Sequence, residues 1–510
     1  MFRTLRDLLS LVKVAWVLAR HDALIPREFA GMVPPPARTI GKISRLGARD
    51  QGKRPGQRLA AALGGQGPAY VKFGQLLATR PDIIGFEMAQ DLGELQDRMP
   101  AFPMAEAEKE VARSLGKPVS ELFASFSEPI AAASIAQVHR AEMSDGQKVA
   151  VKVLRPGIEK KARTEFRVLH LGARLAQRFI PASRRLEPVK FISTLMEASE
   201  VELDLRIEAG SASELRENLA EMDDIVIPEV VWERSSRRVL TTQWIDGTAL
   251  SDPEGLAART INRTRLAQRA MQVFLTTALD HGFFHADMHQ GNLLIDGQGR
   301  LVLIDFGIMG RLDEPARKAF AEIIFGFVRR DYKLAAKAHF DAGYVPPHFN
   351  MEAFATALRA VGEPIFNKRA NEFDMSRVLQ QLFDVTDIFD MHLRPELVLL
   401  QRTMVVVEGV ARVLDPKIDL WRTAEPIVQA YIQRELGAAA FRRRARTSAE
   451  AAVSLIDALP EFAQAAENVA GQLANGGLKL SDDTIERLAR AMRGKPLKDD
   501  EDAFKGGKRH

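Results

Sequence analysis

One short stretch constrains this chain more than any other. It runs HADMHQGNLLIDGQGRLVLIDFG, from His285 to Gly307. Two apolar, β-branched runs flank the polar turn DGQGR, and this pattern predicts a β-hairpin. Asp287 precedes the hairpin with Asn292 five positions after it, and Asp305 follows the second strand. The sequence therefore predicts that one hairpin positions two carboxylates and a carboxamide.

Two chemistries compete for this stretch. His285, Asp287 and His289 could be metal ligands, since they offer imidazole and carboxylate groups together. In kinases, however, an Asp accepts the proton of the substrate hydroxyl, an Asn five positions later binds a metal ion, and the Asp of a following DFG binds another. The DFG favours this second interpretation. We predict that Asp287 positions or deprotonates the nucleophile and that Asn292 and Asp305 bind Mg²⁺. The two histidines are then structural or orienting groups.

A candidate phosphate-binding lysine lies in a second predicted hairpin. Lys152 belongs to VAVKVL, a β-branched run that follows the turn at 144–146. In kinases, the lysine of such a strand contacts the α- and β-phosphates and is oriented by a helix glutamate. Glu208, in ELDLRIEAG, is the expected partner. The hinge that would contact adenine is expected at Gln243, Trp244 and Ile245.

The same region differs from ordinary protein kinases in two places. No GxGxxG precedes Lys152, and the corresponding nucleotide loop is expected at Ala131, Ala132, Ala133 and Ser134. The Cβ of alanine restricts how closely backbone amides approach a phosphate. The segment after Gly307 passes directly into a helical pattern, which leaves no room for a loop that docks a protein substrate. A conventional protein kinase is therefore not expected.

Together these residues resemble the UbiB/ADCK family of atypical kinases over roughly residues 60–420. The stretch GPAYVKFGQLLATRPDIIG contains the family's KxGQ motif, with Lys72 and Gln75. The ExD motif corresponds to Glu202 and Asp204. The resemblance implies that Lys72 and Gln75 lie on a helical extension over the protein-substrate site. It also implies a regulatory latch in which Lys72 faces Glu202 and Asp204.

The resemblance further implies a role in ubiquinone (coenzyme Q) biosynthesis, with ATP or ADP and Mg²⁺ as cofactors. Expected partners are ubiquinone-biosynthesis enzymes or prenyl-lipid intermediates. One alternative is a nucleotide-gated scaffold or chaperone that transfers no group. A small-molecule kinase of the aminoglycoside-phosphotransferase type is another, although it would not need KxGQ. Direct hydroxylation of prenylphenols is disfavoured, because the chain has neither a flavin fingerprint nor a cysteine for haem.

Charge and amphipathicity point to a membrane surface. The net charge of +4 is too small to indicate nucleic acid binding. Residues 1–60, however, hold twelve Lys and Arg against four Asp and Glu, and a second basic cluster lies at 442–446. A helical stripe near the N-terminus consists of Leu5, Leu8, Leu9, Val12, Trp16 and Ala19. This stripe either packs on the body of the protein or lies in an anionic membrane interface.

No stretch offers the ~20 apolar residues that a transmembrane helix needs, and the N-terminus is not a convincing signal peptide. We therefore expect a cytoplasmic protein that is peripheral at the inner membrane. The absence of cysteine excludes disulfides, thiolate catalysis and Cys-based metal sites.

The expected fold is α+β, a protein-kinase-like two-lobed fold with a helical N-terminal extension. Strands are expected within 128–155, at 293–305, and as the pair IPEVVWE and RRVLTTQWI near 225–246. The expected segments are an amphipathic helix and basic linker (1–58), a helical extension with KxGQ (59–125), an N-lobe (126–247), a C-lobe (248–420), and a helical C-terminal region with a disordered tail (421–510).

Overall fold

The computed structural model describes residues 2–23, 52–78, 84–93, 95, 99–179, 184, 187–365, 375–391 and 394–436. The chain divides into two compact units, Met1–Ile432 and Gln433–His510. The architecture below is that of the first unit. The predicted basic cluster at 442–446, the predicted disordered tail and most of the basic linker lie outside the described residues.

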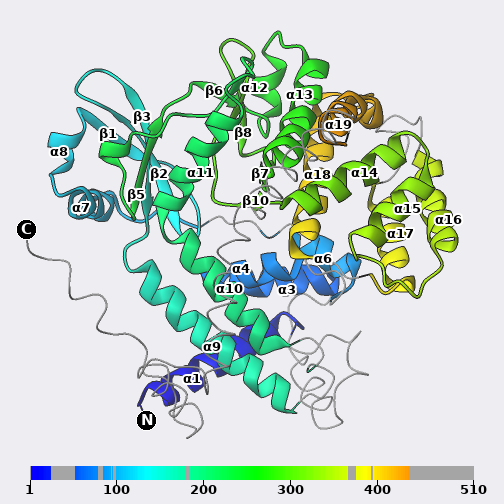
Figure 1. Ribbon diagram of the computed structural model, residues 1–510. Helices are drawn as coiled ribbons and strands as arrows, with labels where there is room; N and C mark the ends of the chain where they lie inside the picture. Colours follow the sequence, from blue (N-terminus) through cyan, green and yellow to red (C-terminus); the bar gives the residue numbers. More distant parts are fainter. Residues whose placement is uncertain are drawn as a thin grey trace, which may run out of the picture. The chain divides into compact units, whose positions relative to one another are not determined.

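The first sheet is antiparallel and has the strand order β1-β2-β3-β5 (Figure 1). Its strands are β1 (Ser125–Ala132), β2 (Ala136–Glu142), β3 (Lys148–Leu154) and β5 (Val239–Gln243). Side chains alternate between the two faces of a strand. On β3, Val149, Val151 and Val153 are fully buried in a cluster with Phe102, beside α7 (Met104–Leu115) and α8 (Val119–Leu122). Lys152 therefore lies on the opposite face.

Three helices connect β3 to the rest of the chain: α9 (Ile158–Phe179), α10 (Pro188–Glu202) and α11 (Leu205–Asn218). The Asp204 side chain accepts the backbone N–H of Arg206 and caps the N-terminus of α11. The predicted strand IPEVVWE is shorter than expected. Val230 forms an isolated bridge to Thr242, flanked by backbone hydrogen bonds from Gln243 to the Glu229 carbonyl and from Val231 to the Thr241 carbonyl. The 3₁₀ turn Trp232–Arg234 ends this pairing.

The second sheet has the order β4-β9-β8-β6, and a separate ribbon pairs β7 with β10. The strands are β4 (Ile225–Val226), β6 (Gly247–Ala249), β7 (Phe283–His285), β8 (Leu293–Asp296), β9 (Leu301–Leu303) and β10 (Met309–Arg311). The predicted hairpin is the antiparallel pair of β8 and β9, in which Leu294 faces Val302. It places Asp305 directly after a buried strand.

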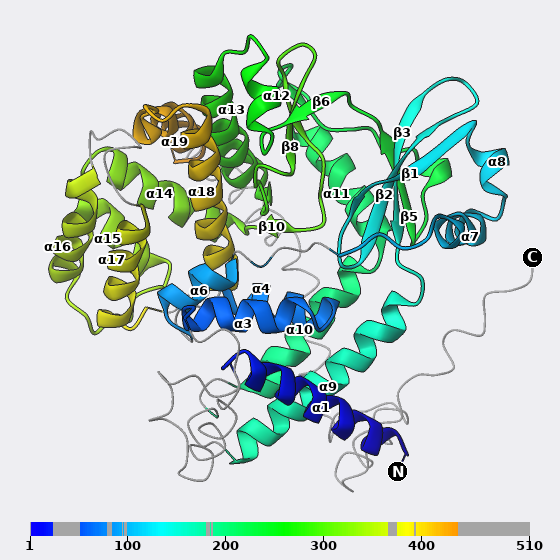
Figure 2. The same cartoon turned by 180° about the vertical axis from the view of Figure 1, so that it is seen from behind.

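Helices make up the rest of this part of the chain. They are α12 (Pro253–Ala257), α13 (Arg263–Thr276), α14 (Glu314–Val328), α15 (Tyr332–Asp341), α16 (Met351–Gly362), α17 (Met375–Ile388), α18 (Pro395–Leu414) and α19 (Leu420–Leu436). Of these, α15, α16 and α17 pack on one another in a cluster of their own, to the side of the second sheet (Figure 2). A π-helical turn, Thr277–His281, continues α13. The largest hydrophobic cluster contains residues of α11, α13, β7, β8, β9, α14 and α18. The predicted α+β organisation is confirmed.

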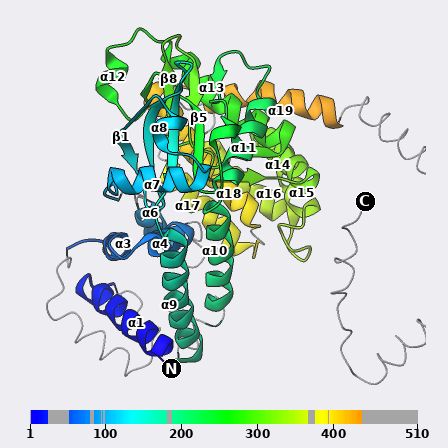
Figure 3. The ribbon, with the colours of Figure 1, turned by 90° about the vertical axis from the view of Figure 1, so that its left-hand side faces the viewer.

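The N-terminal extension contains α3 (Pro55–Gly64), α4 (Pro68–Ala78) and α6 (Phe86–Gly93), which share a cluster around Leu63, Tyr70 and Leu92. The helix α1 (Phe2–Arg20) packs along α9 (Figure 3). Asp7 of α1 pairs with Arg167 of α9 at 3.4 Å. No helix of the described residues is long and apolar enough to cross a membrane.

A glycine in the ribbon after the DFG provides a test of the packing. Gly310 pairs across the strands with Phe284, and a Cβ at Gly310 would lie 2.2 Å from the Phe284 ring. Phe284 is fully buried, so the ring has little room to move. We predict that Gly310→Ala costs about 1–3 kcal/mol of stability, measured as a fall in the calorimetric Tm.

Gly409→Ala is the matched control. Gly409 lies inside α18, and its added Cβ would meet nothing within 4 Å. The same substitution there is expected to raise stability by about 0.5–1 kcal/mol through helix propensity. Equal Tm values for Gly310→Ala and the unchanged protein would contradict the packing of β7 against β10.

Candidate active site

A lysine joins two carboxylates at the centre of the described structure. Lys152 Nζ donates to Glu208 Oε1 at 2.7 Å and to Asp305 Oδ2 at 3.1 Å. The three side chains come from β3, from α11 and from the end of the β8–β9 hairpin. Glu208 is only 8% exposed, whereas Asp305 is 43% exposed. Of these two carboxylates, Asp305 is therefore the one that is accessible to solvent.

The electrostatics of this group favour charged partners. Burial alone would lower the pKa of Lys152, but Asp305 and Glu208 outweigh burial and raise it. Burial alone would raise the pKa of Asp305, but Lys152 and the N–H of Gly307 lower it well below its usual range. Burial raises the pKa of Glu208, with Lys152 opposing. Lys152 is thus cationic and Asp305 anionic at neutral pH.

The loop after β7 is organised by its own polar groups. The N–H of Asp287 donates to His285 Nδ1 at 3.0 Å, and Asn292 Nδ2 donates to the Asp287 carbonyl at 3.0 Å. Asn292 also accepts the N–H of Ile304 through its backbone carbonyl at 3.1 Å, which ties this loop to the residue before Asp305. The structure thus brings Asp287 and Asn292 into contact and connects both to the DFG segment.

The histidines do not form a metal site with Asp287. The Nδ1 atoms of His285 and His289 accept backbone N–H groups within the loop, from Asp287 and from Gly291. His285 is buried, and burial lowers its pKa. Among the described residues, no group of three or more His, Asp and Glu side chains is arranged to hold a metal ion.

Asn292 and Asp305 fit Mg²⁺ better. The amide nitrogen of Asn292 makes a hydrogen bond within the loop, so the amide oxygen is the atom that could bind a metal ion. Asp305 adds a partly exposed carboxylate. Mg²⁺ prefers oxygen ligands and is usually held by one or two protein groups together with substrate phosphates. Such a site needs no cluster of three acidic or imidazole groups.

The predicted nucleotide loop joins β1 to β2. Ala131 and Ala132 end β1, and the N–H of Ala133 donates to the Ala136 carbonyl at 2.8 Å, so the chain turns tightly. Ser134 is buried within this turn.

The predicted hinge lies on the connection from the first sheet to the second. Gln243 ends β5 and its N–H donates to the Glu229 carbonyl at 2.7 Å. The Trp244 N–H donates to the Lys148 carbonyl at 3.0 Å, and its indole N–H donates to Asp246 Oδ1 at 2.7 Å. Ile245 is half-buried. An adenine contact by these residues remains a prediction.

The KxGQ helix reaches the ExD segment. Lys72 Nζ contacts the carboxylate of Glu202 at 2.8 Å, and Gln75 Nε2 contacts the Leu95 carbonyl at 3.4 Å. The Asp204 carboxylate instead receives two hydrogen bonds from the Arg206 guanidinium, at 2.9 and 2.6 Å. Glu202 ends α10 and Asp204 caps α11, so the Lys72 contact lies next to the helix that carries Glu208.

Three further residues support this arrangement and were not predicted. Thr403 of α18 is fully buried and donates to the Ala286 carbonyl at 3.1 Å, directly before Asp287. Glu165 and Arg155 likewise form hydrogen bonds with backbone atoms of distant segments. A threonine among polar residues between the apolar runs VLL and MVVV was the only signal in the sequence for Thr403.

Glu165 caps the helix that carries Lys72. Its Oε2 accepts the N–H of Ala69 at 3.0 Å, at the start of α4. The preceding Gly67 has φ +136°, and a Cβ there would lie 2.2 Å from Glu165 Oε1. Glycine is therefore required for the close approach. Burial raises the pKa of Glu165 to about 7, against the opposing effects of the Ala69 N–H and Lys161.

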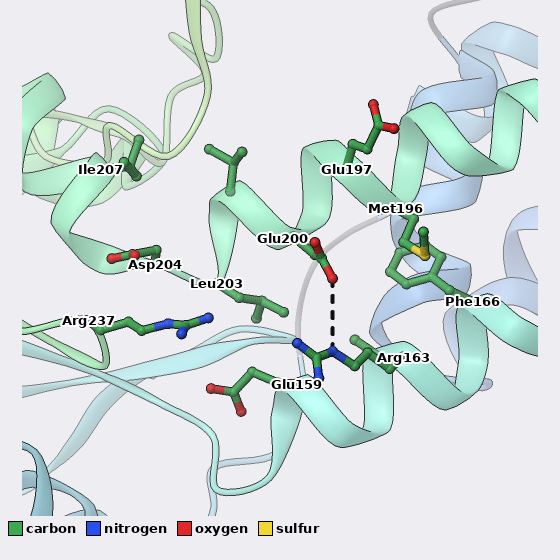
Figure 4. A pocket seen from close by; sticks show the side chains of 12 residues that line it. Glu159, Arg163, Phe166, Met196, Glu197, Glu200, Leu203, Asp204, Ile207 and Arg237 are labelled. Atoms are coloured by element: carbon green, nitrogen blue, oxygen red, sulfur yellow. Dashed lines mark ion pairs between the residues drawn. The ribbon is translucent and has the colours of Figure 1, made fainter. Parts of the chain in front are cut away.

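A cavity of about 420 Å³ lies beside the ExD segment (Figure 4). It opens between α9, α10 and the start of α11, and Phe166, Met196 and Leu203 form its apolar part. Arg163 pairs with Glu200 at its edge at 3.9 Å. Lys152, Asp287 and Asp305 do not line this cavity.

Comparisons with known proteins identify the family. Residues 94–339 match the ABC1 atypical kinase-like domain and residues 358–419 match the UbiB helical domain. The chain is 39% identical over 435 residues to a probable protein kinase UbiB from Marinobacter nauticus, which covers 84% of this chain and 79% of the relative. The chain belongs to the UbiB family of atypical kinases. The predicted resemblance is confirmed.

Other UbiB relatives support this assignment. A probable protein kinase UbiB from Aliivibrio fischeri is 39% identical over 76% of this chain and 73% of its own length. One from Aeromonas hydrophila is 36% identical over 86% of this chain and 82% of its own length. The solved complex of Rv3197 with erythromycin from Mycobacterium tuberculosis has a TM-score of 0.51 and 24% identity. It covers 77% of this chain and 97% of that one, and the predicted kinase-like fold is confirmed.

Glu165 provides a pH-dependent test of the extension. In the folded protein its pKa is about 7, above the usual value near 4.5, so the folded state binds the proton more tightly. This contribution to stability is complete below pH ~4.5 and is lost as the pH rises through about 7. We predict that Glu165→Gln removes part of the fall in Tm between pH 5.5 and 8, measured by calorimetry.

Glu197→Gln controls for the loss of a carboxylate, because Glu197 is exposed on the neighbouring α10. This control is expected to follow the unchanged protein. Parallel Tm profiles for Glu165→Gln and Glu197→Gln would sink the interpretation of Glu165 as a titrating cap.

Proposed function

We propose that this UbiB-family chain is an atypical kinase or ATPase that binds Mg–nucleotide between its two sheets and supports ubiquinone biosynthesis. The observation that carries the proposal is the contact of Lys152 with both Glu208 and Asp305. In kinases, the corresponding lysine–glutamate pair and DFG aspartate must both be in place for catalysis.

Each residue of the site has a proposed role. Lys152 contacts the phosphates of ATP or ADP and Glu208 orients it. Asp287 positions the nucleophile or accepts its proton. Asn292 and Asp305 hold Mg²⁺, which neutralises charge on the phosphates when bound. The alanine-rich loop, Ala131 to Ser134, covers the phosphates.

A small acceptor or a presented lipid precursor fits the segment after the DFG better than a protein substrate. Gly307 is followed directly by β10, and α14 begins at Glu314. Arg311 within this segment forms two hydrogen bonds with Glu214 of α11, at 2.9 and 2.6 Å. Since no long activation segment is present here, we propose prenyl-lipid intermediates as substrate or cargo, with ubiquinone-biosynthesis enzymes as partners.

Turnover tests the proposal. We predict Mg²⁺-dependent ATP turnover by the purified chain, and a loss of about 100-fold or more in Asp287→Asn because a general base is removed. Nucleotide affinity in this variant is expected to change less than threefold. Release of ADP by coupled assay and affinity by calorimetry are the two measurements.

Asp341→Asn is the control for the charge change, because Asp341 pairs with Lys337 on an exposed part of α15. It should turn over ATP like the unchanged protein. If the unchanged protein binds the nucleotide tightly but does not turn it over, the proposed enzyme is contradicted and a nucleotide-gated scaffold is favoured.

We also propose that α1 anchors the protein peripherally to the cytoplasmic face of an anionic inner membrane. Leu9, Val12 and Trp16 are 63%, 65% and 56% exposed, and Leu5 and Leu8 continue this stripe. Within the described part of the chain, this stripe is therefore left open to solvent, which favours the membrane alternative over packing on the body of the protein. The opposite side of α1 rests on α9, while Arg20 lies over the Trp16 ring at 4.6 Å. An exposed apolar stripe with nearby cations is typical of interfacial helices.

Vesicle flotation measures this contact. The full chain should float with anionic phospholipid vesicles and less so as salt rises, since salt screens the charges. Val12→Glu should weaken binding about tenfold, because burying a valine contributes ~1.5 kcal/mol. Ile388→Glu, at a position 66% exposed on α17, is the matched control and should bind like the unchanged chain. Equal flotation of the two variants would refute the anchor.

A further inference from the structure

A single arginine holds the alanine-rich loop in place. The Arg155 guanidinium donates two hydrogen bonds to the Ala133 carbonyl, from Nε at 2.9 Å and from Nη2 at 2.7 Å. The backbone N–H of Arg155 donates to the Ile135 carbonyl at 2.8 Å. Thus two carbonyl groups of the loop region are bound by one residue that directly follows β3.

Arg155 approaches the loop from the face opposite to Lys152. Side chains alternate along β3, so Val153 points to one face and Lys152 to the other. The Arg155 guanidinium lies 5.5 Å from the centre of the Phe102 ring, and Phe102 shares the buried cluster with Val153. The Ala133 carbonyl therefore turns toward this face, away from the lysine. A carbonyl oxygen that turned toward the phosphates would repel them.

The same guanidinium binds a second segment. Nη2 also donates to the Pro100 carbonyl at 2.7 Å, in the segment that leads from the N-terminal extension to α7. The Gln137 side chain accepts the N–H of Phe102 at 2.9 Å and donates to its carbonyl at 3.3 Å. Arg155 thereby holds the loop to this connecting segment. Gln137 in turn holds the connecting segment to β2.

The backbone of Arg155 is itself fixed. Arg238 donates to the Arg155 carbonyl at 3.0 Å, and Arg238 is held by Glu110 at 2.6 Å and by Glu159. These contacts hold the Arg155 backbone from which the guanidinium reaches the loop. A planar guanidinium can bind two carbonyl groups at once in a fixed geometry, whereas an ammonium cannot reproduce this fork.

We propose that Arg155 is a positioning residue for nucleotide binding, which holds the Ala133 carbonyl away from the phosphates and fixes the alanine-rich loop to the segment after the N-terminal extension. This inference rests on the proposed function, because it assigns the loop to the nucleotide. Arg155 acts through the loop backbone and does not contact the reacting groups. Its guanidinium geometry, rather than its charge alone, is what the loop requires.

Hydrogen exchange of the nucleotide-free full chain tests the clamp itself. In Arg155→Gln and Arg155→Lys, amide exchange in residues 133–136 should be at least tenfold faster than in the unchanged protein. Exchange in α9 should stay unchanged, because the fold around it is kept. Unchanged loop exchange in both variants, or faster exchange throughout α9, would overturn the proposal.

Calorimetric binding of Mg–ADP tests the consequence for the nucleotide. Both variants should bind about tenfold more weakly, and Arg155→Lys should not restore affinity, since the fork is missing. Arg329→Gln is the matched control, because Arg329 also lies over a phenylalanine, at 5.6 Å from the Phe325 ring, but at the end of α14. It should bind like the unchanged protein.

The two proposals fail in different ways. If the unchanged protein binds no Mg–ADP, the proposed function fails and this inference fails with it. If the unchanged protein binds Mg–ADP and the Arg155 variants bind equally well, only the positioning role is overturned. Full affinity in Arg155→Lys alone would also overturn it, because charge would then suffice.

Discussion

An ammonium group shared by two carboxylates joins three distant parts of this chain. Lys152 comes from the first sheet, Glu208 from the helix α11 and Asp305 from the end of the second sheet. Glu208 is almost fully buried, so removing Lys152 would leave an uncompensated carboxylate, at a cost of about 3–5 kcal/mol. The same contact therefore stabilises the fold and prepares the site, and Lys152 is a poor position for a purely functional substitution.

The helices around Glu208 connect this group to the N-terminal extension. Lys72 contacts Glu202 at the end of α10, Asp204 caps α11, and Glu208 follows one turn later. Glu165 of α9 in turn caps the helix that carries Lys72. The extension is thus held by Glu165 and by Glu202, and Glu202 lies only a few residues before Glu208 in the chain. This arrangement connects the KxGQ helix to Lys152 through Glu202, Asp204 and Glu208.

Local patterns in the sequence predicted the elements that hold the candidate site residues. The alternation in LLIDGQGRLVLI was enough to predict the β8–β9 hairpin, and Asp305 follows it as expected. The pattern overestimated the strand at 227–233, because the pairing with β5 is limited to residues around Val230 and the 3₁₀ turn at Trp232 ends it. The stripe on α1 predicted an amphipathic helix but not which side the body of the protein would cover, since that depends on packing against α9.

The contacts that escaped prediction share one property. Arg155, Glu165 and Thr403 bind backbone atoms of Ala133, Ala69 and Ala286, which lie far from them in the sequence or across a turn. A backbone acceptor or donor leaves no mark on residue type at its own position. Such pairs are visible only once the chain is folded. Asp204 is a different case, because its partner is the side chain of Arg206, two residues away.

The most direct test of the central claim is calorimetric binding of ADP to the full chain, with Mg²⁺ or with EDTA, beside Asp305→Asn. This variant keeps the size of the side chain and an oxygen that can accept from Lys152. The account predicts binding that requires Mg²⁺ and weakens at least tenfold in Asp305→Asn. Equal affinity in EDTA, or equal affinity in the variant, would contradict a metal–nucleotide site organised by Lys152, Glu208 and Asp305.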